Sequence, residues 1–93
     1  MATYGIIVFF RFEKLTEEDE KIARSEWEKV KKEFPETVKL LGVYYHAMGT
    51  RYNGFLLIET TDLNDFFSFW KTFKDKIRWY VSETTTIISM KAE

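Results

Sequence analysis

The order of apolar and polar positions along the chain predicts four strands. Residues 4–12 (YGIIVFFRF) are β-branched and aromatic, and the run is too short before the next polar cluster to form a helix, so it predicts a strand. Residues 37–47 (TVKLLGVYYHA) and 54–60 predict two more strands, joined by a turn over 48–53. Residues 79–90 (WYVSETTTIISM), rich in threonine, isoleucine and aromatic residues, predict the last strand.

Two segments between these strands carry apolar residues at helical spacing. Thr16, with an acidic residue three positions later, forms a variant of the capping box, and Pro35 prevents continuation, so a helix is predicted from about 16 to 34. Asp62 resembles a second cap and predicts a helix over about 62–77. The apolar stripe of the first helix comprises Ile22, Ala23, Trp27, Val30 and Phe34, and that of the second Leu63, Phe66, Phe67, Trp70, Phe73 and Ile77.

The resulting order, β-α-β-β-α-β, predicts an α+β domain of the ferredoxin-like type. Right-handed crossovers place both helices on one face of a four-stranded antiparallel sheet whose first and third strands are central. If the other face were wet, the central strands would alternate polar and apolar residues, but 6–10 (IIVFF) and 55–58 (FLLI) are apolar throughout. The helix-free face must therefore be covered, and a homodimer joined through the two sheets is predicted.

Length and composition restrict the functional classes. A chain of 93 residues without an internal repeat predicts a single domain over 1–93. The net charge of −1 leaves no basic stripe, which argues against binding to nucleic acid or to a membrane surface. Cysteine is absent and no secretory leader is recognisable, so a cytoplasmic location is expected.

Several familiar sites are poorly matched. Residues 51–58 (RYNGFLLI) loosely echo the strand consensus of RNA-recognition domains, but Asn53 and Ile58 stand where aromatic residues are needed. The acidic segment 11–20 offers no phosphate cradle of the acylphosphatase kind. The chain has one histidine and no cluster that predicts a metal site, and no cofactor is required, although haem on a single proximal histidine stays open as a minor possibility.

The candidate catalytic residues are His46 and Glu59. If the hairpin turn centres on residues 50 and 51, His46, Tyr44 and Glu59 share one face of the sheet, and Glu59 lies opposite Gly42, which has no side chain. Such a gap beside a carboxylate is typical of a small-ligand site. A slip of one residue in the hairpin register would turn His46 away from Glu59, and a purely local hydrogen-bonding role for His46 is the alternative.

The candidate ligand-binding residues are Tyr44, Arg11, Trp70 and Trp79. Arg11 either reaches solvent at the end of the first strand, which is the commoner outcome, or pairs with a carboxylate such as Glu59. The two tryptophans serve the core first and line a ligand second.

The segment VKLLGVYYHAMGTRYNGFLLIETTDLNDFFSFW, at 38–70, resembles the hairpin-to-helix segment of the dimeric α+β barrel superfamily, in particular its small stand-alone domains of uncharacterised or monooxygenase type. The resemblance covers nearly the whole chain. It implies a homodimer whose two sheets meet, with a pocket between sheet and helices in each subunit. It transfers no catalytic residue, because the catalytic residues of the branches differ. Two functions follow: a small-molecule-binding homodimer, and alternatively a cofactor-free oxygenase- or isomerase-like enzyme in which His46 or Glu59 acts as acid or base.

The amide content predicts a thermophilic origin. Glutamine is absent and asparagine occurs only at 53 and 64, whereas lysine and glutamate are abundant. We expect the melting temperature, measured by calorimetry, to lie above the usual range of mesophilic domains. A midpoint near about 50 °C would argue against this origin.

Overall fold

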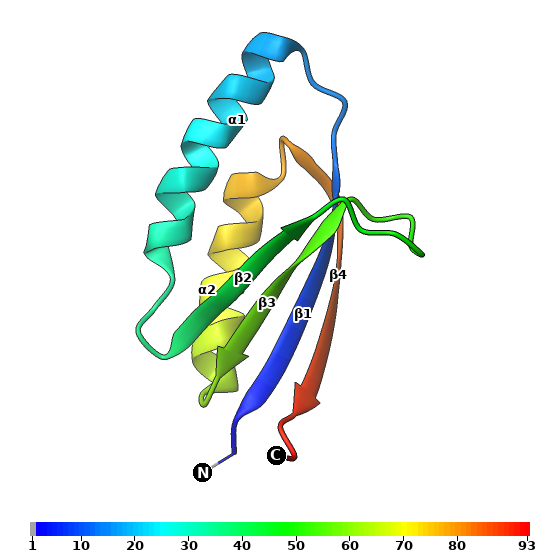
Figure 1. The fold of residues 1–93 in the computed structure, drawn as a ribbon. Helices are drawn as coiled ribbons and strands as arrows, with labels where there is room; N and C mark the ends of the chain where they lie inside the picture. The colour runs from blue at the N-terminus through cyan, green and yellow to red at the C-terminus, as the bar shows by residue number, and fades with distance from the viewer. Residues whose placement is uncertain (1) are drawn as a thin grey trace.

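The computed structural model describes residues 2–93 and has the predicted order of elements (Figure 1). The strands pair only antiparallel, in the order β2-β3-β1-β4, so β1 and β3 are central, and both helices lie behind the sheet. The ferredoxin-like α+β fold is therefore confirmed. The elements are β1 (Tyr4–Phe12), α1 (Glu17–Val30), a short 3-10 turn (Lys31–Glu33), β2 (Val38–Tyr45), β3 (Gly54–Thr60), α2 (Leu63–Ile77) and β4 (Val81–Met90).

Both helices begin at the caps that the sequence predicts. The Asp19 amide donates to Thr16 Oγ1 at 3.1 Å, and the Asp65 amide donates to Asp62 Oδ1 at 3.1 Å, which satisfies one free amide at each helix start. No helix among the described residues is long and apolar enough to cross a membrane.

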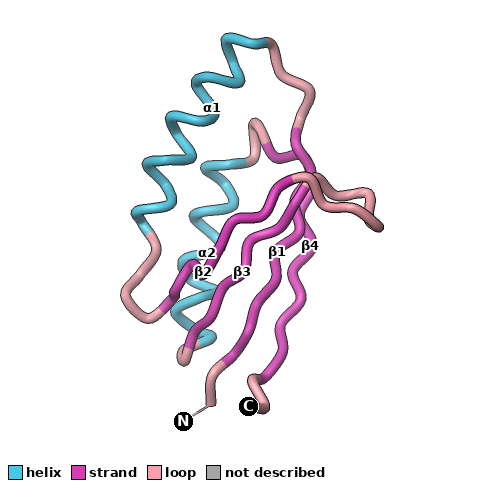
Figure 2. Tube along the Cα trace, in the orientation of Figure 1, coloured by secondary structure: helices cyan, strands magenta, loops and turns pink. Residues whose placement is uncertain are grey.

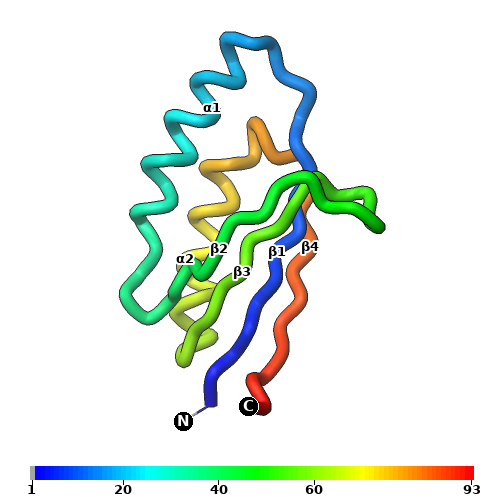
Figure 3. Tube along the Cα trace, in the orientation of Figure 1, coloured from blue at the N-terminus to red at the C-terminus, as the bar shows by residue number. Residues whose placement is uncertain are grey.

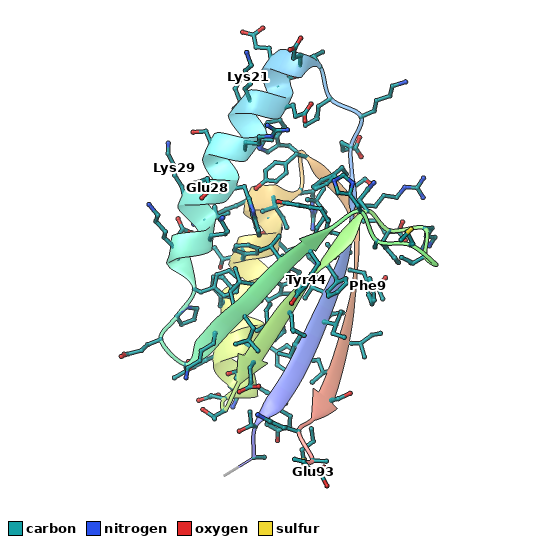
Figure 4. All side chains as sticks on the ribbon, in the orientation of Figure 1. Phe9, Lys21, Glu28, Lys29, Tyr44 and Glu93 are labelled. Carbon is teal, nitrogen blue, oxygen red and sulfur yellow. The ribbon has the colours of Figure 1, made fainter. Side chains whose placement is uncertain are left out.

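The two faces of the sheet are both apolar, as predicted. Side chains at positions 6, 8 and 10 of β1 and at the even positions of β3 point toward the helices and are buried, including Ile6, Val8 and Ile58. Side chains at odd positions point away from the helices and stay partly exposed. This second surface, here called the outer face, comprises Ile7, Phe9, Tyr44, Phe55, Leu57 and Ile87, and Phe9 and Tyr44 are labelled on it in Figure 4.

The apolar stripe of α1 is narrower than predicted. Ala23 and Val30 are buried, but Ile22 is 47% exposed. Ile22 stands one position from Ala23, which rotates it by about 100° around the helix and off the buried side.

Three connections meet at one end of the sheet (Figure 2). The end of β1, the loop between β2 and β3, and the start of β4 lie there together with the beginning of α1 and the end of α2. The two termini lie side by side at the opposite end (Figure 3), where the Lys91 amide donates to the Thr3 carbonyl at 2.7 Å. Residues distant in sequence are thus gathered at the connected end.

Gly54 permits a close approach inside the β2–β3 hairpin. A Cβ atom at this position would lie 1.9 Å from the Tyr44 carbonyl oxygen and 2.8 Å from the Phe10 ring. We expect Gly54→Ala to lower the free energy of unfolding by about 2–3 kcal/mol in denaturant titrations, because the backbone of β2 must move.

Gly5, in β1, is the matched control. A Cβ at Gly5 would meet nothing within 4 Å, so Gly5→Ala should change stability by less than about 1 kcal/mol. Equal effects of the two substitutions would contradict the close approach at Gly54.

Candidate functional site

A cavity of about 730 Å³ opens between α1 and the sheet at the connected end. Its volume lies in the range of pockets that bind small organic molecules. Apolar side chains from the centre of the sheet form its floor, among them Val8 and Leu56, and Ala23 of α1 and Ile77 of α2 close it from the helix side. The topology therefore places a pocket between sheet and helices, with contributions from both.

Aromatic rings form much of the wall. Phe10, Phe12 and Tyr45 make a cluster in which Phe10 and Phe12 lie 5.1 Å apart by ring centroids and Tyr45 lies 6.0 Å from each. Phe12 is 43% exposed and Tyr45 50% exposed, although both are large and partly apolar. Trp27 of α1 and Trp70 of α2 also line the cavity.

Tyr80 supplies an enclosed polar group. It stands between α2 and β4, is 5% exposed and lines the cavity, and its hydroxyl has no hydrogen-bond partner among the described residues. Burial, reinforced by the negative charge of Glu26 and by Tyr45, raises the pKa of Tyr80 to about 12. The hydroxyl is therefore a proton donor without an acceptor at neutral pH, which is a rare and costly state for a buried group.

Most of the charged residues around the cavity form ion pairs with one another. Arg24 Nη2 lies 3.0 Å from Glu20 Oε1, and Lys31 Nζ lies 2.9 Å from Glu28 Oε1. Glu13 also lines the cavity and makes no ion pair among the described residues, while its amide donates to the Tyr80 carbonyl at 2.9 Å. Among the described residues, the rim thus carries excess negative charge, and its one arginine, Arg24, is already paired with Glu20.

His46 lies at this cavity rather than within a strand. It is exposed, follows the end of β2 and has a φ of 59°, in the left-handed region. That conformation turns the chain out of the sheet and into the loop.

Glu59 lies elsewhere, near the other end of β3 and on the outer face, where its carboxylate lies 3.6 Å from Lys91 Nζ. It pairs across the hairpin with Lys39. Tyr45 of β2 pairs with Gly54 and His46 lies one residue further on, so His46 and Glu59 are separated by about six residues of strand, or roughly 20 Å. The structure does not bring these two residues together.

The hairpin register differs from both registers considered from the sequence. Gly42 lies opposite Leu57 rather than Glu59, and the pairing shifts by one residue between Leu40 and Gly42. The shift is a β-bulge, which places an extra residue, Leu41, in β2. The predicted arrangement of Glu59 beside Gly42 is therefore wrong, because Tyr45 pairs with Gly54 and the hairpin centres on residues 49 and 50 rather than 50 and 51, which moves the partner of Gly42 by two residues. The bulge shifts the pairing by one residue more, so that Glu59 pairs with Lys39.

Tyr44 and Arg11 both point away from the cavity. The Tyr44 ring stacks on Phe55 of the outer face at 4.7 Å between centroids and covers Gly42, where a Cβ would lie 2.7 Å from the ring. Arg11 is exposed at the end of β1, opposite Glu83 of β4.

The two candidate tryptophans have different positions. Trp70 lines the cavity and packs against Phe66 and Phe73. Trp79 is 40% exposed and donates its indole proton to Glu26 at 2.8 Å, which ties the start of β4 to α1. Of the candidate site residues, only Trp70 and His46 contribute to the cavity.

Tyr80 and Asn53 were not singled out as site residues from the sequence. Tyr80 stands between Trp79 and Val81, and these apolar neighbours predict burial but not an unpartnered hydroxyl. Asn53 holds the β2–β3 loop against β1, because its side-chain oxygen accepts from the Phe12 amide at 2.7 Å. In the sequence, the position of Asn53 in a predicted turn is the only indication of this role.

The described residues do not fit a resident metal or haem. They contain no group of three or more histidine, cysteine, aspartate or glutamate residues that could hold a metal ion. The one histidine is exposed at the rim, and the cavity wall offers no uncommitted cation for the propionates of haem.

Comparison with protein families identifies the chain over nearly its whole length. Residues 3–92 match the model of a family described as a domain of unknown function, DUF3303. No curated protein matches the sequence.

Solved structures with the same fold include proteins of the predicted superfamily. A dabb family protein with a ferredoxin-like fold from Mesorhizobium loti has a TM-score of 0.71 and 13% identity, with 100% of both chains covered. A dimeric ferredoxin-like protein of unknown function from Thermobifida fusca has a TM-score of 0.60 and 14% identity, with 97% of this chain and 92% of that chain covered.

A chlorite dismutase from Candidatus Nitrospira defluvii, in complex with imidazole, has a TM-score of 0.75 and 12% identity. The match covers 98% of this chain but only 40% of that one. At such identities the likeness shows the fold alone, and it confirms the ferredoxin-like fold.

The raised pKa of Tyr80 predicts a loss of stability at alkaline pH. Above about pH 10 the unfolded chain releases the tyrosine proton, whereas the folded protein keeps it to about pH 12. The unfolded state then binds fewer protons, so the free energy of unfolding falls as pH rises through this window, by roughly 2–3 kcal/mol from this residue. In denaturant titrations between pH 9 and 12, the free energy of unfolding of wild type should fall more steeply than that of Tyr80→Phe, which has no such proton to release, so the two curves should diverge toward the alkaline end. Parallel curves would contradict the assignment.

Proposed function

We propose, from the premise that this chain belongs to the DUF3303 family of domains of unknown function, that it is a homodimer that binds a small, largely apolar molecule in the cavity between sheet and helices. The observation that carries the proposal is the cavity itself, which combines an apolar floor, aromatic walls and one enclosed polar group. Pockets for small organic ligands are built in this way, with few polar groups among many apolar ones.

The outer face supports the homodimer. Six apolar or aromatic side chains lie together on it, and Ile87 and Tyr44 are 49% and 47% exposed. Charged residues frame the patch, with Lys39 and Glu59 at one end and Arg11 and Glu83 at the other. Because each end carries both signs, a second copy related by a twofold axis meets complementary charges and an apolar centre. Structures of the same fold are described as dimeric, which agrees with this arrangement.

Leu57→Lys tests the dimer. Leu57 lies at the centre of the outer face between Ile7 and Gly42, so a buried, unpaired ammonium would separate the subunits. Sedimentation equilibrium should give a dimer for wild type and a monomer for Leu57→Lys at micromolar concentration. Ile22→Lys, on an exposed side of α1, is the matched control and should stay dimeric. A monomeric wild type would overturn this part of the proposal.

Ala23→Trp tests the cavity. Ala23 is 7% exposed and faces the cavity from α1, so an indole there fills the space without altering the sheet. We expect the neutral dye N-phenylnaphthylamine to bind wild type at micromolar concentration with a rise in fluorescence, and to bind Ala23→Trp at least about 10-fold more weakly.

Ile22→Trp is the matched control, because the neighbouring residue is exposed and does not line the cavity. Dye binding that survives Ala23→Trp, with the variant folded by far-ultraviolet circular dichroism, would show that the dye binds elsewhere. That result would contradict the proposed site.

A further inference from the structure

We infer that the molecule held in this cavity is uncharged, contains a flat ring system, and carries a carbonyl oxygen that accepts a hydrogen bond from Tyr80. This inference rests on the proposed function and adds the chemical class of its ligand. Three features of the cavity carry it: the aromatic wall, the unpartnered hydroxyl and the charge of the rim.

The aromatic wall favours a flat ring system. Phe12 and Tyr45 remain about half exposed beside the cavity although each packs against Phe10, so their remaining surface is available to a further ring. Trp27 and Trp70 present indole rings from the two helices. Aromatic side chains bind flat rings by offset stacking and edge contacts in addition to the burial of area.

The hydroxyl of Tyr80 requires an acceptor rather than a donor. The hydroxyl remains protonated at neutral pH, since burial raises the pKa of Tyr80 to about 12. A hydrogen-bond partner for this proton must therefore be an acceptor. No described residue provides that acceptor. A carbonyl oxygen in the ligand would satisfy the hydroxyl without adding a charge to an enclosed site.

The charge of the rim disfavours an anionic ligand. Arg24 and Lys31 are paired with Glu20 and Glu28, and Glu13, which also lines the cavity, adds a carboxylate that makes no ion pair among the described residues. A ligand carboxylate would therefore enter an enclosed site with no cation to pair with and a negative neighbour. The ligand oxygen that meets Tyr80 is accordingly neutral.

Three related dyes test the inference on the full-length protein. The first is prodan, a neutral naphthyl ketone whose emission reports hydrogen bonding to its carbonyl. The second is its propyl analogue, in which a methylene replaces the carbonyl. The third is the corresponding naphthoate, which carries a carboxylate. Binding of each is measured at neutral pH to wild type, Tyr80→Phe, Glu13→Lys and Ala23→Trp.

We expect wild type to bind prodan at least about 10-fold more tightly than the naphthoate. Tyr80→Phe should weaken prodan binding about 3–10-fold and shift its bound emission to the blue, but leave the propyl analogue unaffected. Glu13→Lys should reduce the ratio of prodan affinity to naphthoate affinity, because it replaces a negative charge at the cavity with a positive one. Ala23→Trp should weaken all three dyes.

The outcomes separate the two proposals. If neither N-phenylnaphthylamine nor any of the three dyes binds in the cavity, the proposed function fails and this inference fails with it. If the dyes bind in a manner sensitive to Ala23→Trp, but the naphthoate binds as tightly as prodan, the inference about charge is overturned alone. If Tyr80→Phe leaves both the affinity and the emission of bound prodan unchanged, the hydrogen bond is overturned, whereas a changed emission supports it even when the affinity loss is small.

Discussion

The whole structure depends on a sheet whose central strands are apolar on both faces. β1 and β3 are each hydrogen-bonded to a neighbouring strand on both sides, so they form the centre of the sheet. The apolar side chains on both of their faces therefore need to be covered from water. Two helices cover one face only. The sheet therefore has two hydrophobic surfaces. The helices cover one of them except at the connected end, where the cavity lies, and the other, the outer face, is uncovered in the single chain.

The fold was predictable because its determinants are local and periodic. The strand at 4–12 and that at 54–60 coincide with β1 and β3, and the caps at Thr16 and Asp62 begin both helices. The candidate site was less predictable, because it depends on register and on distant contacts. The hairpin turn centres one position earlier than expected, which moves the partner of Gly42 from Glu59 to Leu57, and the bulge at Leu41 shifts the pairing of Glu59 by one residue more. A bulge of this kind is set by how the strand packs rather than by its own residues.

The enclosed hydroxyl of Tyr80 illustrates the same limit and links stability to binding. A phenylalanine would have the same shape and no unsatisfied group, so the hydroxyl lowers the stability of the empty protein by about 1–3 kcal/mol. Apolar periodicity predicts that position 80 is buried, and nothing in the neighbouring residues shows that the hydroxyl lacks an acceptor. Binding sites commonly contain groups that lower the stability of the folded protein, because the hydrogen-bond partner of such a group comes from the ligand.

The β2–β3 loop shows how unevenly one short segment tolerates change. Tyr52 lines the cavity and also packs on Phe9 of the outer face at 5.6 Å, and Arg51 bonds to Glu83 at 2.9 Å. The tip is different, because Met48 is 95% exposed. Hairpin tips are usual places for peptide insertions. An epitope or fluorescent reporter introduced beside Met48 would leave both surfaces intact, whereas the same graft three or four residues later would disturb the cavity and the outer face together.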